Sequence, residues 1–403
     1  MKNSIVFILI LIGFHSHAQW ATTWSPSARQ LWSVFFVNPN YGFAVGDTGT
    51  IIKTTNGGAT WTLKSNVTAN DLHAVFFLNV DTGFVVGHNR IMRTIDGGTS
   101  WTEQYNGSGF VAYSVFFPSH STGYVVGSNG FIIKTTDYGT TWNSLYTGYG
   151  RNFFSVHFPT VDTGYVAGAC TPDQGGQQTI LKTTNGGSTW FSVNDTLYHW
   201  TSFNSVFFIN KDVGYVAGQK GTGVIYRTTN GGVSWQHSNI TDIGYVNSVH
   251  FTSAEVGYAV GAQCEIFKTH DGHDWVNQFQ GFGVYWLNSV CFANDTVGFA
   301  VGFGGLIMKT TNGGAVAINE SPPIISDRFS VSPNPMNNKA VLSSNYSGNA
   351  EIIQTDGKIV KSFRVYKSSQ EIDLHELPPG LYFIKLIQDN GIALSKKFLI
   401  ARP

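Results

Sequence analysis

The side chains with the clearest chemical pattern in this sequence belong to a short phrase that recurs along the chain. Its first copy is Lys-Thr-Thr-Asn-Gly-Gly-Ala-Thr-Trp at residues 53–61, where Asn56 stands at a position that other copies give to Asp. A carboxylate or amide there could bind a metal, act in catalysis, or bond to nearby backbone N–H groups and close a turn. Because the position recurs in every copy and is often Asn, the pattern favours turn closure.

The other residues of the phrase fit the same structural role. Its glycines supply backbone angles that other residues resist, and its tryptophan is a large flat filler between neighbouring sheets. The acidic or amide residues are Asn56, Asp96, Asp137, Asn185, Asn230, Asp271 and Asn312, and the tryptophans are Trp61, Trp101, Trp142, Trp190, Trp235 and Trp275. We therefore expect clasps at these residues, with no metal and no cofactor.

Binding chemistry is expected instead from arginines and aromatic residues that lie between the copies of the phrase. Sugar rings and peptides stack on aromatic faces, although many large aromatic residues simply pack in the core. An arginine cluster could hold a carboxylate. The candidates for a ligand-binding face are Arg29, Arg90, Tyr105, Tyr149, Arg151, Trp200, Tyr245 and Trp286.

A second recurring phrase sets the period of the chain. Gly-Phe-Ala-Val-Gly at residues 42–46 has counterparts whose first glycines are spaced by 40 to 50 residues. Residues 31–63 contain four short strands separated by turns, which is the pattern of one β-propeller blade. The repeats predict an all-β, seven-bladed propeller over residues 19–314. Because the last copy stops at Gly314 without its tryptophan, residues 20–25 are expected to supply the missing strand and close the ring.

The first phrase, Thr54-x-Asn-x-Gly-x-Thr-Trp61, resembles the Asp-box of sialidases and of bacterial neuraminidase (BNR) repeats. Together with the second phrase it is more similar to the propellers of photosystem II assembly and stability factors, over about residues 24–314. Such repeats also occur in secreted bacterial proteins that have no photosynthetic role. In sialidases the active site lies on the face opposite the Asp-box turns, so the resemblance implies that the ligand-binding face is that opposite face.

The same resemblance raises the question of catalysis. A sialidase needs an arginine cluster, a Tyr–Glu nucleophilic pair and an acid. Arg29, Arg90 and Arg151 are available in this chain, but no Tyr–Glu pairing is visible in the sequence. We therefore expect a non-enzymatic binding propeller, with a sialidase-like glycoside hydrolase or lectin as the alternative.

The beginning of the chain and its composition indicate export. Lys2 precedes an apolar run from Ile5 to Phe14 that is too short to span a bilayer, and small residues lead up to Ala18, so residues 1–18 are expected to form a signal peptide. No later segment is apolar over a length that would form a transmembrane helix. With 24 basic and 24 acidic side chains, the sequence lacks the basic excess of a nucleic-acid-binding protein.

Composition changes after the last repeat. Residues 315–328 include a Ser-Pro-Pro segment and are expected to form a linker. Residues 329–403 contain seven short predicted strands, which favours a small Ig-like β-sandwich. This segment resembles the type A C-terminal sorting domain of the type IX (Por) secretion system of Bacteroidota, through its motifs at 331–335, 356–360, 377–385 and 396–400.

The resemblance of the tail implies export across the outer membrane, followed by removal of the tail. An ordinary carbohydrate-binding or adhesive sandwich is the alternative. The expected protein is therefore secreted or held at the cell surface. Its expected partners are the type IX secretion machinery and an extracellular protein or glycan, and it is expected to act as a monomer.

Overall fold

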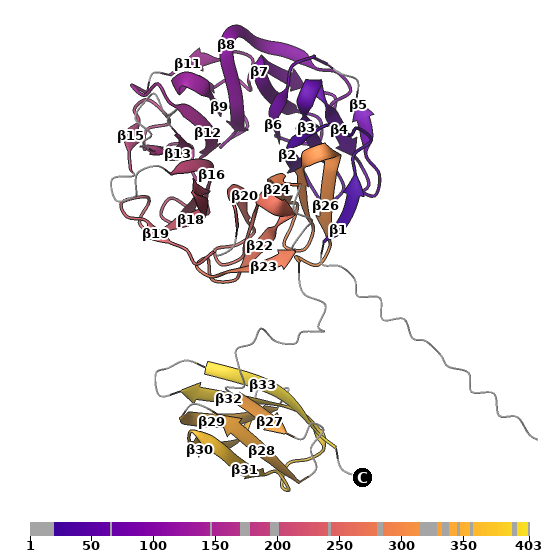
Figure 1. Cartoon of the computed structure of the whole chain (residues 1–403), viewed down its shortest axis with the longest axis vertical. Helices are drawn as coiled ribbons and strands as arrows, with labels where there is room; N and C mark the ends of the chain where they lie inside the picture. The colour runs from indigo at the N-terminus through magenta and orange to yellow at the C-terminus, as the bar shows by residue number, and fades with distance from the viewer. Residues whose placement is uncertain are drawn as a thin grey trace, which may run out of the picture. The chain divides into compact units, whose positions relative to one another are not determined.

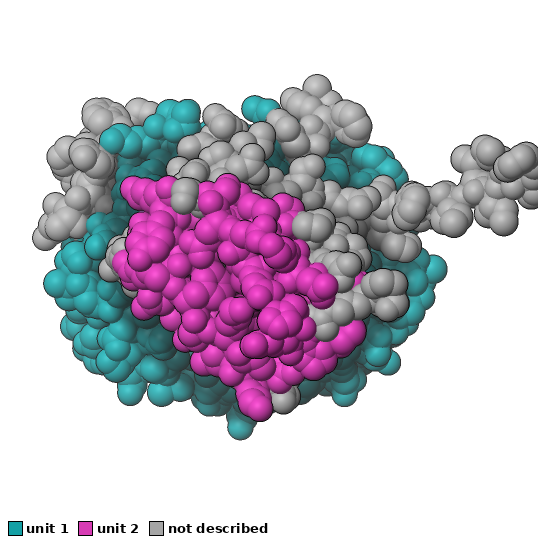
Figure 2. Space-filling model, turned by 90° about the horizontal axis from the view of Figure 1, so that it is seen from below, with its two compact units in different colours: residues 1–317 teal, residues 318–403 magenta. Residues whose placement is uncertain are grey.

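The computed structural model divides the chain into two compact units, residues Met1–Ala317 and Ile318–Pro403 (Figure 2). It describes residues 20–64, 67–145, 147–169, 178–193, 201–240, 243–279, 285–314, 329–332, 338–344, 347–354, 358–388 and 393–401. The expected signal peptide, residues 1–18, and the expected linker, residues 315–328, lie outside the described residues. Within the described residues, no helix has the length and apolarity needed to cross a membrane.

The first unit is a ring of antiparallel sheets around a central channel (Figure 1). Each four-stranded sheet runs from an innermost strand at the channel to an outermost strand at the rim (Figure 1). The first four-stranded sheets are β2 (Leu31–Phe36), β3 (Gly42–Gly46), β4 (Ile51–Thr54) and β5 (Thr62–Lys64), then β12 (Asn152–His157), β13 (Gly164–Ala169), β14 (Gln178–Thr183) and β15 (Phe191–Ser192). The next are β16 (Ser202–Phe208), β17 (Gly214–Lys220), β18 (Thr222–Thr228) and β19 (Gln236–His237), then β20 (Val246–Phe251), β21 (Gly257–Gly261), β22 (Ile266–Thr269) and β23 (Trp275–Phe279).

One sheet of the ring has six strands. It consists of β6 (Leu72–Phe77), β7 (Gly83–Thr94), β8 (Thr102–Phe116), β9 (Gly123–Gly127), β10 (Ile132–Thr135) and β11 (Asn143–Ser144). The first part of β8 pairs with β7, through partners such as Arg93 and Thr102, and its last part pairs with β9. The segment around Tyr105, expected to be a loop between repeats, is therefore part of a strand.

The ring closes through its first described strand. β24 (Leu287–Phe292), β25 (Gly298–Gly302) and β26 (Leu306–Thr310) form a sheet whose outermost strand is β1 (Ala21–Trp24). Just before β1, Trp20 is 1% exposed and meets Phe292 edge-on, with ring centroids 5.9 Å apart. Trp61 meets Phe36 in the same way at 5.9 Å, so Trp20 takes the place of the tryptophan that the last copy of the phrase lacks.

Aromatic pairs join neighbouring sheets of the ring. Phe43 of β3 stacks on Phe77 of β6 with ring centroids 3.8 Å apart, and Tyr165 of β13 stacks on Phe208 of β16 at 3.5 Å. A Cβ added at Gly42 would collide with the Phe36 ring, so the glycine that opens the second strand makes room for the phenylalanine that ends the first. The recurring phrases thus specify the contacts within and between sheets.

The second unit contains two antiparallel sheets around one core. One sheet is β27 (Phe329–Ser332), β28 (Lys339–Ser344) and β31 (Ser368–Asp373), and the other is β30 (Ile359–Val365), β29 (Gly348–Gln354), β32 (Gly380–Gln388) and β33 (Ala393–Ile400). Leu342 from the first sheet and Ile352 and Ile384 from the second are fully buried in the same cluster. Alternating apolar residues on facing strands therefore build a sandwich core.

Candidate functional site in the central channel

The recurring phrase forms a turn that is closed by hydrogen bonds among its own threonine and asparagine residues. In the first copy, the Thr54 hydroxyl donates to Asn56 Oδ1 at 3.0 Å and accepts the N–H of Gly58 at 2.8 Å. The amide nitrogen of Asn56 donates to Thr60 Oγ1 at 2.9 Å, and Asn56 Oδ1 accepts the Thr60 N–H at 2.9 Å. These bonds tie the turn to itself, which is the turn closure that the pattern favours for Asn56.

The acidic copies of the phrase use the same bonds. Ser100 donates to Asp96 through its hydroxyl at 2.6 Å and its backbone N–H at 2.9 Å, and these bonds, with one from Thr94, lower the pKa of Asp96 to about 2. In the shortened copy, Asp271 accepts the N–H groups of His273 and Asp274, both at 2.8 Å. Among the described residues, no group of three or more His, Cys, Asp or Glu side chains could hold a metal ion.

The three candidate arginines lie on different sheets or links and have different surroundings. Arg90 forms an ion pair with Glu103 in its own β7–β8 hairpin. The Arg151 guanidinium lies over the Tyr149 ring, 5.6 Å from its centroid. Arg29 is exposed just before β2. Two of the three arginines thus contact residues close to them in sequence.

The aromatic candidates pack in separate places. Tyr105 lies 5.6 Å from Phe110 between ring centroids, and Trp286 lies 4.6 Å from Phe303. Tyr245 is half-buried, and its carbonyl accepts the N–H of Ala262. Trp200 lies outside the described residues. The described candidates therefore contact different neighbours and are not gathered into one site.

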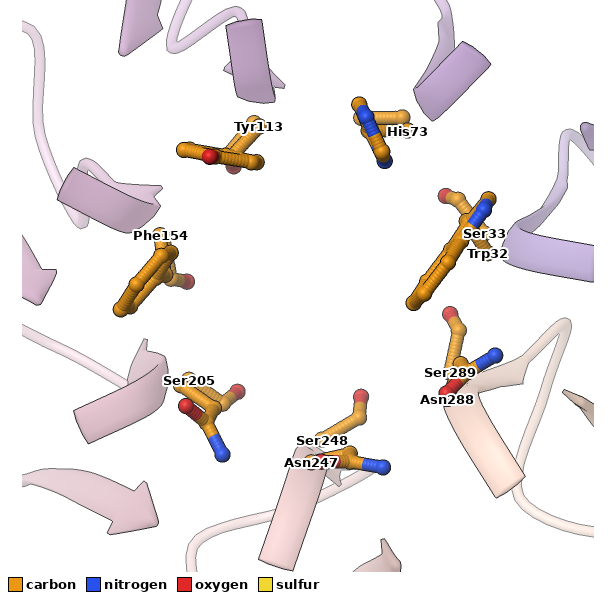
Figure 3. Close-up of a pocket in the computed structure, with 14 residues that line it drawn as sticks. Trp32, Ser33, His73, Tyr113, Phe154, Ser205, Asn247, Ser248, Asn288 and Ser289 are labelled. Carbon is orange, nitrogen blue, oxygen red and sulfur yellow. The ribbon is translucent and has the colours of Figure 1, made fainter. Parts of the chain in front are cut away.

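A cavity of about 390 Å³ occupies the channel itself (Figure 3). Each innermost strand contributes two consecutive residues to its wall. The lining residues are Trp32, Ser33, His73, Ala74, Tyr113, Ser114, Phe154, Ser155, Asn204, Ser205, Asn247, Ser248, Asn288 and Ser289. None of these residues belongs to the recurring turns. The first residue of each pair varies among the strands, whereas the second is serine in every strand except β6.

The cavity lies toward the face opposite the recurring turns. The Trp32 indole N–H donates to Asp47 Oδ1 at 2.7 Å, and Asp47 begins the short turn η1 (Asp47–Gly49) between β3 and β4. The recurring turn instead bonds to the β2–β3 turn, where the Gly57 N–H donates to the carbonyl of Asn40 at 3.0 Å. The cavity thus opens beside the β3–β4 turns, on the face that the sequence predicts for ligand binding.

One half of the cavity wall is aromatic. The rings of Trp32, His73, Tyr113 and Phe154 point into the channel from neighbouring strands (Figure 3). The ring centroids of Trp32 and His73 are 5.5 Å apart, those of His73 and Tyr113 5.5 Å, and those of Tyr113 and Phe154 5.2 Å. These contacts hold the four rings, which we call the aromatic arc, as one continuous surface.

The other half of the wall is built from asparagines. The amide nitrogens of Asn204, Asn247 and Asn288 donate to backbone carbonyls of the next sheet at 3.0, 2.9 and 2.8 Å. Each amide thus commits one of its two N–H hydrogens to the wall and keeps its oxygen as an acceptor and its second N–H as a donor. We call these three residues the asparagine arc.

A belt of serines runs beside both arcs. The Ser33 hydroxyl oxygen accepts the Val75 N–H at 3.3 Å, and Ser205 accepts the Val249 N–H at 3.2 Å. The remaining bonds of this type join Ser114 to Val156, Ser155 to Val206, Ser248 to Val290 and Ser289 to Val34. Ala74 takes the serine position in β6. Each serine hydroxyl accepts a bond across a sheet boundary and keeps its own hydrogen to donate.

The cavity wall carries no net charge at neutral pH. Burial, with the neighbouring His88 as a smaller cause, lowers the pKa of His73 to about 4, so this histidine is neutral. Burial also raises the pKa of Tyr113 above its usual value. Among the described lining residues there is no carboxylate, lysine or arginine. The site can therefore supply aromatic faces and neutral hydrogen-bonding groups.

None of the eight residues predicted for a ligand-binding face is among the residues that line this cavity. The signal of this wall in the sequence lies in the residue just before a nearly constant Ser-Val pair in each innermost strand, because that residue varies among the strands. That position reads Trp32, His73, Tyr113, Phe154, Asn204, Asn247 and Asn288 around the ring. A position that varies while its neighbours stay constant would have indicated the residues that line the channel.

Comparisons with known proteins agree with this architecture. Residues 13–105, 67–147 and 108–246 match the family model of the photosynthesis system II assembly factor YCF48, and residues 330–401 match that of the secretion system C-terminal sorting domain. The two resemblances seen in the sequence are thereby confirmed. No curated protein sequence matches this chain.

Several solved structures share the fold at low sequence identity. YCF48 bound to a D1 peptide has a TM-score of 0.59 and 17% identity, covering 73% of this chain and 97% of that one. PorZ, an essential surface component of the type-IX secretion system of Porphyromonas gingivalis, has a TM-score of 0.52 and 12% identity, covering 90% and 58%. An ancestral GH74 enzyme has a TM-score of 0.59 and 14% identity, covering 94% and 63%. At these identities the likeness concerns the fold alone.

Proposed function

This chain belongs to the family of the photosynthesis system II assembly factor YCF48, and on that premise we propose that it is a non-enzymatic binding protein of the cell surface or the medium. Its propeller holds an extracellular protein or polysaccharide in the central cavity. The observation that carries this proposal is the cavity wall, in which the aromatic arc faces the asparagine arc across the channel. A concave site with aromatic faces and a few fixed polar groups is what ligand recognition requires.

The proposal includes a propeller of seven blades. β8 serves two blades, because its first part pairs with β7 and its last part with β9. Divided within β8, the six-stranded sheet supplies two blades, and the other five sheets of the ring supply one each. The tail is then the Ig-like sandwich that follows the propeller.

The tail supports export by the type IX secretion system. Residues 330–401 match the sorting-domain family, and the described strands β27 to β33 form a sandwich with its own core. We expect deletion of residues 329–403 to leave the propeller in the periplasm of the producing bacterium. Cell fractionation with an antibody to the propeller measures this, and export of the truncated chain at the level of the full chain would refute the assignment.

The composition of the cavity supports binding rather than hydrolysis. Glycoside hydrolysis commonly uses two carboxyl groups on either side of the scissile bond. The described cavity lining contains none, and Glu103, an acid of the same unit, forms an ion pair with Arg90. We therefore propose no enzymatic activity.

Binding is tested with the full chain as bait for outer-membrane proteins and surface polysaccharides. We expect the full chain to retain a ligand and the Trp32→Ala variant to lose most of it, because Trp32 contributes the largest ring of the aromatic arc. Far-UV circular dichroism of the variant checks that the fold is intact. Retention of the same ligand by both proteins would exclude the cavity as the binding site.

A further inference from the structure

We infer that the cavity binds an uncharged glycan, a chain of neutral hexose or N-acetylhexosamine units. This inference rests on the proposed function and specifies its ligand class. It follows from three properties of the wall: its aromatic surface, the direction of its hydrogen-bonding groups, and its lack of charge.

The aromatic arc offers a curved surface for a sugar chain. Trp32, Tyr113 and Phe154 lie partly open to the channel, and neighbouring rings of the arc meet at interplanar angles of 61°, 55° and 62°. The arc therefore presents ring faces and edges that turn around the channel axis. The apolar faces of successive pyranose rings can pack on such a surface while their hydroxyl groups remain free to bond elsewhere.

The opposite wall matches those hydroxyl groups. Asn247 and Asn288 line the cavity and each donate one amide N–H to the next sheet at 2.9 and 2.8 Å, which fixes the amide group and leaves its oxygen as an acceptor. Ser205 and Ser248 accept backbone N–H groups at 3.2 and 3.3 Å, so their hydroxyl hydrogens remain as donors. Fixed acceptors beside fixed donors suit a ligand whose groups both donate and accept, which is the chemistry of a sugar hydroxyl.

The absence of charge selects among ligands. An acidic sugar or a peptide terminus would bring a charge into a wall whose described lining holds no charged group, and burying an uncompensated charge is unfavourable. Two acids beside the wall are already engaged, since Asp47 accepts the Trp32 N–H at 2.7 Å and Asp71 accepts the Thr48 N–H at 2.8 Å. A neutral glycan has no such cost, so we favour it over uronic acids, sialic acids and peptide ends.

The test uses the purified full chain and two matched variants. Phe154→Ala removes one ring of the aromatic arc, and Phe191→Ala makes the same truncation on β15, the outermost strand of the same sheet, where Phe191 is 45% exposed. The probes are short manno-, cello- and chito-oligosaccharides, sialylated and uronate-containing oligosaccharides, and peptides with free or with blocked ends. Affinities are measured by glycan array and isothermal titration calorimetry.

We expect one or more of the neutral oligosaccharides to bind, Phe154→Ala to weaken that binding at least about tenfold, and Phe191→Ala to leave it unchanged. A tenfold loss corresponds to about 1.4 kcal/mol of binding free energy. Binding of an acidic oligosaccharide or a peptide, if weakened by Phe154→Ala, would overturn the ligand class and leave the proposed binding function standing. No binding of any probe, or binding that Phe154→Ala does not change, would overturn this inference. The proposed function would be overturned as well only if the full chain captured no ligand from outer-membrane proteins and surface polysaccharides, or if Trp32→Ala captured the same ligand.

Discussion

The Lys53 ammonium nitrogen lies 2.7 Å from the carbonyl oxygen of Gly97, so a lysine of one sheet holds the recurring turn of the next. Lys134, Lys182 and Lys268 make the same bond to Gly186, Gly231 and Gly313 at 2.7, 2.8 and 2.7 Å. The lysine that opens the recurring phrase is thus explained by its neighbour in the ring. Each of these four copies closes its own turn and also fastens the following one.

Replacing Lys53 with Met is expected to lower the free energy of unfolding by about 1–3 kcal/mol, because a charge-assisted hydrogen bond to a carbonyl is lost while the side-chain stem is kept. Urea unfolding followed by tryptophan fluorescence measures the change. Lys211→Met is the control, since the Lys211 side chain is exposed and forms a surface ion pair with the adjacent Asp212. Equal effects of the two substitutions would show that the bond to Gly97 contributes nothing specific.

The turn itself is tested at Thr54, which is 1% exposed and accepts the Gly58 N–H at 2.8 Å. Thr54→Val keeps the shape but leaves that buried N–H without its acceptor, so we expect a loss of about 1–3 kcal/mol in unfolding free energy. The same substitution at the exposed Thr62, whose bond to the Lys53 carbonyl is 3.2 Å long, should cost less. Denaturant unfolding compares the two variants, and a smaller loss at Thr54 than at Thr62 would contradict this account.

The serine belt predicts a stabilising substitution at Ala74. In the equivalent positions a serine accepts the N–H of the valine that follows the serine position on the next innermost strand, as Ser33 does from Val75 at 3.3 Å. Ala74→Ser should offer the same acceptor to Val115 and raise the free energy of unfolding by about 1 kcal/mol. Ser33→Ala is the reverse control and should lower it by a similar amount. Thermal unfolding of both variants decides, and destabilisation by Ala74→Ser would show that the local geometry differs.

The buried His250 of β20 predicts how stability depends on pH. His250 lies at a position where other innermost strands carry phenylalanines such as Phe207, 5.3 Å from it between ring centroids, and burial lowers its pKa from 6.5 to about 4. The unfolded chain therefore takes up a proton below about pH 6.5 that the folded chain refuses, so stability falls as the pH decreases toward 4. At about pH 5 this histidine lowers stability by at most about 2 kcal/mol relative to neutral pH.

His250→Phe should remove that contribution. When the pH is lowered from about 7 to 5, we expect the melting temperature of the variant to fall less than that of the original chain, as measured by differential scanning calorimetry. His120→Phe, on an exposed histidine, is the control and should leave the pH dependence unchanged. His157 also has its pKa lowered, to about 3, by burial and by His250, so part of the pH dependence should persist in the variant. An identical pH profile for the His250 variant and the original chain would contradict the assignment.

The sequence by itself determined the local structure of this protein. The glycines, Thr54 and Asn56 of the recurring phrase act within a few residues of each other, so the pattern is enough to predict the strands and turns of the ring. The sorting domain was predicted from the resemblance of the tail's motifs to a known family. The last repeat lacks its fourth strand and its tryptophan after Gly314, whereas the segment around Trp20 has that strand sequence without the three strands before it. The sequence therefore predicted that the two ends complete one sheet, and β1 pairs with β26 as expected.

Only the tertiary structure decided which side chains share a site. The candidate residues Arg90 and Tyr105 find partners in their own hairpin and sheet, whereas Trp32 and Asn288 meet in one cavity although 256 positions separate them in the sequence. Strand periodicity says that a residue lies on an inner strand, but a bulge between Leu31 and Ser33 shifts the register and sets which side chains line the channel. Closure of the ring then brings the first and last inner strands together, as when Ser289 accepts the Val34 N–H. Contacts of this range depend on the geometry of the whole ring, which no single repeat contains.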